Sequence, residues 1–242
     1  MSGNLALEKE ILEQKRKDIL SEVEEKRKYQ AEIAKKLRIL TKEAKGSYDQ
    51  EKENTEKIYN LLKKEIENYE EALKNPYFGR VDFNEKLGIE EKIYIGKKGI
   101  TSTVDGEEIV VDWRAPVADL YYSGTGGDTY YKAPMGVVEG ELNLKRKFLF
   151  NDDNLDKIFD ESTNEIIING EEGSELVDEF LKINLEESRG KKLKEVVATI
   201  QKEQNDIIRW PKNLPIIVQG SAGSGKTTIA LHRLAYLLYR YR

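Results

Sequence analysis

Eight consecutive residues near the end of this 242-residue chain have the types and spacing needed to hold a chain of phosphates. Residues 220–227 read Gly-Ser-Ala-Gly-Ser-Gly-Lys-Thr and match G-x-x-x-x-G-K-[ST] at every fixed position. The glycines let successive backbone N–H groups curl around phosphate oxygens, and the start of a following helix adds its positive dipole end. Lys226 would supply a cation at the β- and γ-phosphates, and the Thr227 hydroxyl is suited to ligate Mg²⁺. We therefore expect ATP and Mg²⁺ as cofactors, with Lys226 in the catalytic role.

The segments on both sides of this loop predict the elements that a phosphate-binding loop needs. Residues 214–219 form a short, β-branched run that contains a proline, and such a run predicts a buried parallel strand directly before the loop. Residues 228–241 are rich in Ala and Leu and predict a helix directly after it. The order strand, loop, helix distinguishes a phosphate site from a chance match to the motif.

A helix is also expected over residues 191–209, and it contains Gln204, which precedes Gly220 by 16 residues. A planar amide can pair with N6 and N7 of adenine, as Asn and Gln do in DNA recognition. A lone glutamine on a helix is ordinarily a solvated side chain. The residues alone leave both interpretations of Gln204 open.

The first 75 residues predict a helical hairpin. Between Leu5 and Leu40 there is neither Gly nor Pro, and apolar residues recur every seven positions, with Lys26 as an interruption. Gly46 and Ser47 indicate a tight turn, two heptad rows resume after it, and Asn75-Pro76 stops the second helix. We expect an antiparallel coiled coil that projects as an arm rather than packing into a core. Its role could be docking, or it could be a structural or dimerising hairpin.

The middle of the chain predicts a small β-rich domain, either an antiparallel sheet or a barrel. Short β-branched and aromatic runs at 78–83, 92–96, 108–113 and 128–131 alternate with turn formers, and 136–150 predicts a long strand with Gly140 as a bulge. The Asp-Trp-Arg-Ala-Pro run at 112–116 could bind a ligand, but residues of these types more often form a buried ion pair beside a core tryptophan. We therefore expect a structural role. The fold class is therefore mixed α/β.

Charge changes sign where these patterns change. Residues 1–75 are neutral overall, residues 76–189 hold 13 basic against 25 acidic residues, and residues 190–242 hold 10 basic against 3 acidic. The boundaries support three domains: a hairpin (1–75), an acidic β-rich domain (76–189) and a nucleotide-binding segment (190–242). The chain has no cysteine, no signal peptide and no apolar run that could span a bilayer, so we expect a cytoplasmic protein with no membrane partner.

The loop, its helix and the spacing of Gln204 resemble those of UvrD/Rep-type superfamily 1 helicases. Within that group the chain resembles the HelD (helicase IV-like) proteins. Besides the hairpin, the features that carry this resemblance are Asn-Pro-Tyr-Phe-Gly-Arg-Val-Asp-Phe at 75–83, Asp-Trp-Arg-Ala-Pro at 112–116 and Trp-Pro at 210–211. It implies that residues 190–242 begin a RecA-like domain. It also implies that the nucleotide is bound by Gln204, Gly220, Ser221, Ala222, Gly223, Ser224, Gly225, Lys226, Thr227 and Thr228.

The family resemblance further implies an ATP-hydrolysing motor that binds RNA polymerase and nucleic acid and remodels or releases their complexes. In that family the hairpin reaches into the secondary channel of the polymerase. Only 15 residues follow Thr227, and no Asp or Glu follows Asp206. We therefore expect an N-terminal fragment that is inactive by itself, whose parent supplies the Walker B acids, the second lobe and the DNA contacts. Two alternatives remain: an ATP-independent polymerase-binding module, or an unrelated P-loop ATPase or kinase with a coiled coil.

Overall fold

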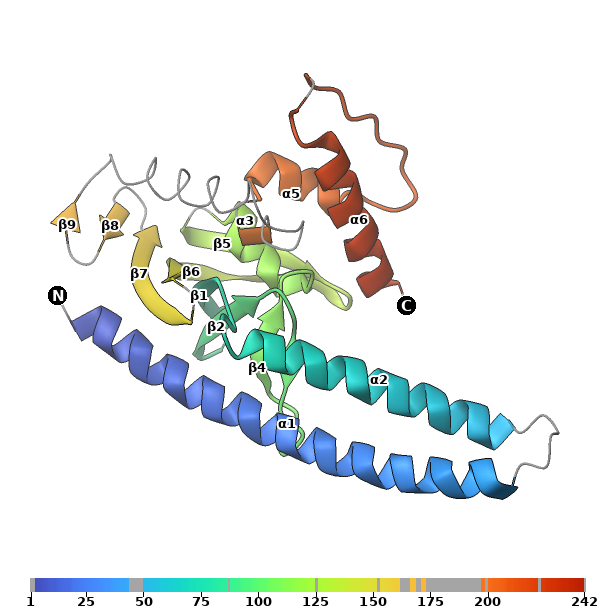
Figure 1. Ribbon diagram of the computed structural model, residues 1–242. Coiled ribbons are helices and arrows are strands. Elements are labelled where there is room, and N and C mark those ends of the chain that lie inside the picture. The colour runs from blue at the N-terminus through green and yellow to red at the C-terminus, as the bar shows by residue number, and fades with distance from the viewer. Residues whose placement is uncertain are drawn as a thin grey trace.

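A computed structural model describes residues 3–43, 50–86, 88–124, 126–151, 153–161, 166–168, 171–172, 197–198, 200–221 and 223–241. Two long helices form a hairpin along one side of a central sheet, and two shorter helices near the C-terminus lie on the other side (Figure 1). Within these described ranges, no helix has the length and apolar character needed to cross a membrane.

The predicted helical hairpin is confirmed. It consists of α1 (Gly3–Glu43) and α2 (Gln50–Ala72). Ion pairs Lys26–Glu65 at 2.9 Å and Lys36–Glu51 at 2.8 Å join the two helices, and their numbering shows that the helices run antiparallel. The Gly46-Ser47 turn lies outside the described residues, and supercoiling of the pair stays a prediction.

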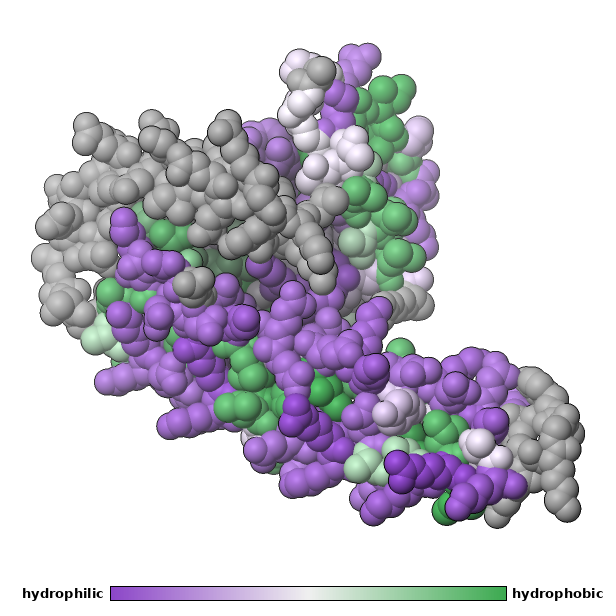
Figure 2. All heavy atoms as spheres, in the orientation of Figure 1, coloured by the Kyte–Doolittle hydropathy of each residue, from purple (hydrophilic) through white to green (hydrophobic). Residues whose placement is uncertain are grey.

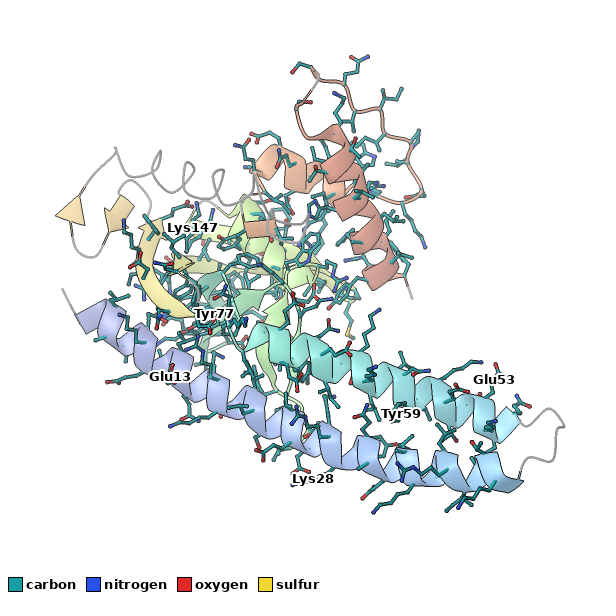
Figure 3. All side chains as sticks on the ribbon, in the orientation of Figure 1. Glu13, Lys28, Glu53, Tyr59, Tyr77 and Lys147 are labelled. Carbon is teal, nitrogen blue, oxygen red and sulfur yellow. The ribbon has the colours of Figure 1, made fainter. Side chains whose placement is uncertain are left out.

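The prediction that the whole hairpin projects is wrong for its base. Leu12, Ile19 and Val23 of α1 are buried and belong to the same cluster as residues of the sheet, including Tyr94, Ile100, Val110, Phe148, Leu155 and Ile158. The heptad seam therefore changes partner along α1, because its first half covers the sheet and its second half faces α2. Figure 3 shows Tyr77 at the base, whereas Tyr59 and Glu53 lie along the part that stands clear of the sheet.

Three polar residues of α1, each seven positions apart, bind the sheet. The Glu8 carboxylate is fully buried and accepts hydrogen bonds from Arg80 at 2.5 Å and Arg146 at 2.6 Å. Lys15 Nζ donates to the carbonyl of Ile109 at 2.6 Å. Glu22 Oε1 accepts from the N–H of Thr103 at 3.0 Å. These contacts fix the direction of the arm relative to the sheet.

The described residues hold one sheet of nine strands in the order β3-β4-β2-β1-β6-β7-β8-β9, with β5 paired to β6. The strands are β1 (Gly79–Glu85), β2 (Glu90–Gly96), β3 (Ile100–Thr101), β4 (Glu108–Asp112), β5 (Gly127–Ala133), β6 (Gly136–Asn151), β7 (Asn154–Glu161), β8 (Ile166–Ile168) and β9 (Glu171–Glu172). The five predicted strand segments are confirmed. The sheet is mixed rather than antiparallel, because the chain reverses twice between β2 and β4 and pairs them in parallel.

The bulge predicted at Gly140 is wrong. The register between β1 and β6 shifts between Asp82 and Phe83, opposite Asn143. Gly140 serves a different purpose, because a side chain there would overlap the carbonyl oxygen of Asn84 and the ring of Phe83. Its lack of a Cβ lets β1 and β6 approach each other.

Four short helices complete the described fold. A 3₁₀ turn, η1 (Pro116–Ala118), leads into α3 (Asp119–Ser123), and α5 (Lys202–Ile208) and α6 (Lys226–Arg240) follow near the C-terminus. Ile208 of α5 and Ile229 and Tyr236 of α6 share a core cluster with Trp113 and Tyr121. The nucleotide-binding segment and the sheet domain are therefore packed together. The helix predicted at 191–209 is confirmed for the residues of α5 and is wrong for Ile200 and Gln201, which are not helical. Residues 191–196 and 199 lie outside the described residues.

Candidate nucleotide-binding site

The phosphate-binding loop has the backbone conformation that its glycines permit. Gly223 and Gly225 have φ of +82° and +81°, a region that other L-residues rarely adopt. A Cβ at Gly220 would lie 2.7 Å from Ser224 Oγ, so a larger residue there would force the Ser224 side chain to move. The N–H of Ser224 donates to the carbonyl of Ser221 at 3.3 Å, which closes the turn. Ala222 lies outside the described residues.

Lys226 is held against the loop that it is predicted to serve. Its Nζ donates to the carbonyls of Gly220 at 2.9 Å and Ser221 at 2.6 Å, and it approaches Ser224 Oγ at 3.4 Å. The ammonium group therefore lies against the loop, where it could also meet an anionic oxygen bound there. Glycine conformation and cation placement together fit a bound triphosphate.

The predicted helix after the loop is confirmed as α6, which starts at Lys226. Thr227 is exposed in its first turn and Thr228 is partly buried beside it. Because Thr227 has a free surface at the helix start, its hydroxyl fits the predicted role as a Mg²⁺ ligand. His232 is buried on α6 and packs edge-on against Trp113 with 5.5 Å between ring centroids, which agrees with a structural role.

The strand predicted at 214–219 is wrong. Residues 215–221 are neither helix nor strand, and Ile217 is 88% exposed. A strand needs a neighbour to satisfy its N–H and C=O groups, and no strand of the described sheet lies beside this segment. Figure 2 shows hydrophobic residues gathered over α6 and the segment before the loop; the exposed ones are Leu214, Ile217, Val218, Leu231, Leu234 and Leu238. The RecA-like nature of residues 190–242 stays a prediction.

Gln204 lies on α5, in its first turn, and is partly buried. Its Oε1 accepts a hydrogen bond from the N–H of Gln201 at 3.2 Å, as half of a capping box. Among the described residues, none accepts a hydrogen bond from its Nε2 and none of the loop bonds to it. The amide thus keeps a donor and one acceptor lone pair with which it could read a base.

The helix that carries Gln204 is fixed to the sheet domain by its neighbours. Asn205 is buried, and its Nδ2 donates to Asp119 Oδ1 at 2.6 Å and to Ser123 Oγ at 2.8 Å. Arg209 donates to the carbonyl of Trp113 at 2.9 Å and to that of Ala115 at 3.2 Å. The sheet domain therefore serves as a platform for α5.

The cluster at 112–116 is structural, as predicted. Asp112 is buried and accepts two hydrogen bonds from the Arg114 guanidinium, at 2.7 and 2.6 Å, and one from the Arg114 N–H at 2.9 Å. Burial works against the charge of the Arg114 guanidinium, but bonding to Asp112 outweighs it and raises the pKa. Arg114 also lies 4.7 Å from the centre of the Tyr239 ring on α6. This cluster joins the end of β4 to the helix that follows the loop.

Arg233 contacts the end of α5, a role that was not predicted from the sequence. Its Nη1 donates to the carbonyls of Ile207 at 3.1 Å, Ile208 at 3.2 Å and Trp210 at 2.7 Å. The helical period could have indicated that Arg233 lies on the packed face of α6. Arg233 follows Ile229 by four residues and precedes Tyr236 by three, and both of these are buried. Asn205 and Arg209 carry no comparable signal in the sequence.

Comparison with known proteins gives an independent result. A family model described as the N-terminal domain of DNA helicase IV HelD matches residues 5–174. The match spans the hairpin and the strands through β9, and it ends before α5 and the phosphate-binding loop. A comparison with curated proteins found no match. Because the family model covers more than half of the sequence, the chain belongs to the family of DNA helicase IV HelD N-terminal domains.

Proposed function

We propose that this chain binds ATP and Mg²⁺ through residues 220–228 and is part of a helicase-like motor that uses ATP hydrolysis to remodel or release complexes of RNA polymerase with nucleic acid. The observation that carries the nucleotide part is the loop geometry, with two glycines at positive φ and Lys226 Nζ against the loop. Membership of the HelD family supports the motor part.

Each predicted residue has a defined task in this proposal. The backbone of residues 220–225 and the start of α6 bind phosphate oxygens, Lys226 neutralises charge on the β- and γ-phosphates, and Thr227 holds the metal ion. Gln204 pairs with the adenine edge. The bound Mg²⁺–ATP supplies the phosphoanhydride bond whose hydrolysis would drive the motor.

Nucleotide binding is tested with Lys226→Ala and a matched control. Lys212→Ala removes a lysine from the same segment, but its Nζ lies 3.9 Å from the centre of the Tyr241 ring and not at the loop. A hydrogen bond to a charged group contributes about 1.5–3 kcal/mol, so Lys226→Ala should weaken Mg²⁺–ATP binding about 10- to 150-fold. Calorimetric titration should show near-normal binding by Lys212→Ala. Equal affinities of Lys226→Ala and the unchanged chain would refute the proposed site.

The distal part of the hairpin is the proposed contact with RNA polymerase. It stands clear of the sheet (Figure 1), and it exposes apolar side chains that a partner could cover, namely Tyr29, Ile39, Ile58 and Leu61. Such exposed residues on a two-helix arm suit insertion into a cleft of a partner protein.

A test of this contact needs a variant that leaves the base of the hairpin intact, because Glu8, Leu12 and Ile19 are buried there. Deleting residues 30–36 together with 51–57 removes one heptad from each helix, keeps the Lys26–Glu65 pair and shortens the arm by about 10 Å. The variant should bind polymerase more weakly in a pull-down and titrate nucleotide normally. Unchanged polymerase binding would count against the arm as the contact.

The same observations bear on the alternatives. An ATP-independent polymerase-binding module is favoured by the clear separation of the arm from the loop, and it would be supported if Lys226→Ala left polymerase release unchanged. Family membership argues against an unrelated P-loop kinase with a coiled coil, because the match covers the hairpin and the sheet together.

A further inference from the structure

Arg233 occupies an unusual position for a charged residue on α6. Its Nη1 points at three carbonyl oxygens, those of Ile207, Ile208 and Trp210, and its Nη2 lies 3.4 Å from the carbonyl of Pro211. The last carbonyls of a helix have no partner within the helix, and a cation there also meets the negative end of the helix dipole. Arg233 therefore acts as a cap for the C-terminal end of α5.

This cap joins the two helices that bear the proposed site. Gln204 lies one turn before Ile208 on α5, and Lys226 lies seven residues before Arg233 on α6. The chain that connects the helices contains neither helix nor strand between residues 215 and 221, so it does little to fix their separation. Apolar packing of Ile208 with the α6 residues adds attraction without direction. Arg233 supplies hydrogen bonds between the two helices, and Arg209 adds a cation–π contact 5.2 Å from the centre of the Tyr236 ring.

The other side of α5 is already fixed. Asn205 bonds Asp119 and Ser123, and Arg209 bonds the carbonyls of Trp113 and Ala115. Gln204 is therefore held by the sheet domain. The helix α6 also contacts that domain, because His232 packs against Trp113 and Tyr239 lies against Arg114, and Arg233 links α6 directly to the end of α5. A ligand that touches both Gln204 and the loop needs the two helices at one separation before it binds.

We propose that Arg233 is a positioning residue that sets the separation between the adenine-reading amide of Gln204 and the phosphate-binding loop. The inference rests on the proposed function, because it presupposes that the loop binds the triphosphate and that Gln204 binds the base. Without Arg233 the loop keeps its own glycine conformation and Lys226, so phosphate binding persists. Base recognition is lost, because the amide no longer lies at the required distance.

The expected effect is a loss of selectivity rather than of phosphate affinity. A bidentate amide–adenine pair corresponds to about 5- to 150-fold in affinity. Arg233→Ala should therefore bring the dissociation constant of Mg²⁺–ATP close to that of magnesium tripolyphosphate, which has no base. The dissociation constant for tripolyphosphate should change by less than about threefold. Gln204→Ala should give the same pattern, since both changes remove the same contribution.

The experiment is a calorimetric titration of the 242-residue chain with Mg²⁺–ATP, Mg²⁺–GTP and magnesium tripolyphosphate. Arg233→Lys keeps a cation that can donate to the same carbonyls and should retain part of the ATP preference. Arg240→Ala is the matched control, because that arginine lies two turns further along α6 and bonds Tyr236 Oη at 3.3 Å. It should behave like the unchanged chain.

Four outcomes would overturn the inference. If Arg233→Ala kept the full preference for ATP over tripolyphosphate, Arg233 would have no positioning role. If it weakened both ligands equally, Arg233 would be a general support of the loop. If the unchanged chain bound tripolyphosphate with no preference for ATP, Gln204 would not read the base, although the loop would stand as proposed. If the unchanged chain bound neither ligand, the proposed function itself would fail. Tripolyphosphate binding by each variant also shows that its loop is folded.

Discussion

The buried carboxylate of Glu8 makes a sharp test of how the hairpin is attached. It accepts hydrogen bonds from Arg80 and Arg146 and a third, at 3.1 Å, from the Tyr94 hydroxyl. Burial and the nearby Glu8 raise the pKa of the Tyr94 hydroxyl, which therefore stays protonated as a donor. Glu8→Ala leaves these three buried donors without their acceptor.

The destabilisation expected for Glu8→Ala depends on the ion pairs that Arg80 and Arg146 keep. Arg80 still pairs with Asp82 and Arg146 still pairs with Asp160, so both guanidinium charges remain neutralised. The remaining cost is that of unsatisfied buried donors and a small cavity, and each buried donor that loses its acceptor costs about 1–3 kcal/mol. Native stabilities are about 5–15 kcal/mol, so this change would remove a large fraction of the total.

Urea unfolding followed by circular dichroism at 222 nm measures this cost. Glu10→Ala is the control, because Glu10 lies on the same helix and is exposed, and it should change the free energy of unfolding by no more than about 0.5 kcal/mol. Glu8→Gln keeps an acceptor oxygen and should fall between the two. The reasoning would be refuted if Glu8→Ala lay within about 1 kcal/mol of Glu10→Ala. It would also fail if Glu8→Gln were more stable than the unchanged chain, because the surplus negative charge would then be a net cost.

Two further predictions concern the sheet. Burial raises the pKa of the Glu161 carboxyl, but Lys147 and Lys145 outweigh this and leave the pKa below its ordinary value. A lowered carboxyl pKa gives stability that is complete above the unfolded value and is lost as pH falls through the folded one. The unchanged chain should therefore lose more stability than Glu161→Gln between pH 6 and pH 3, as measured by urea midpoints; parallel losses would contradict this. Gly96→Ala should destabilise the chain by about 1–3 kcal/mol, because a Cβ there overlaps the carbonyl oxygen of Pro76. Gly88→Ala, at an exposed position, is the control. Equal thermal midpoints of the two variants would contradict the prediction, because they would show that the sheet accommodates a side chain at Gly96.

Local patterns predicted the elements whose stability is local. The heptads of residues 5–73 and the turn formers between strands indicate helices and strands correctly, because period and propensity act within a few residues. The loop conformation at Gly223 and Gly225 was predictable for the same reason. These features depend on the residue itself and its near neighbours in the chain.

The predictions that failed concern segments whose structure depends on a partner far away in the sequence. The seam of Leu12 and Ile19 has the pattern of a helix-pair interface, and nothing in that pattern tells whether a second helix or a sheet will cover it. Residues 214–219 have strand composition, but a strand forms only beside another strand. Glu8 has the sequence of a solvated helix residue, and its burial depends on two arginines more than 70 residues away. Periodicity carries no information about any of these partners.

The anchoring of α1 by late parts of the chain has a consequence for biosynthesis. Arg146 is made 138 positions after its partner Glu8, and Phe148, Leu155 and Ile158, which share an apolar cluster with Leu12 and Ile19 of α1, are made later still. Such long sequence separation delays native contact, because the intervening loop must first close. At translation rates of about 5–20 residues per second, α1 waits on the order of 10 s with its apolar seam uncovered. The helix α1 is therefore made well before the strands that bury its base, and during that interval its apolar seam is open to a chaperone.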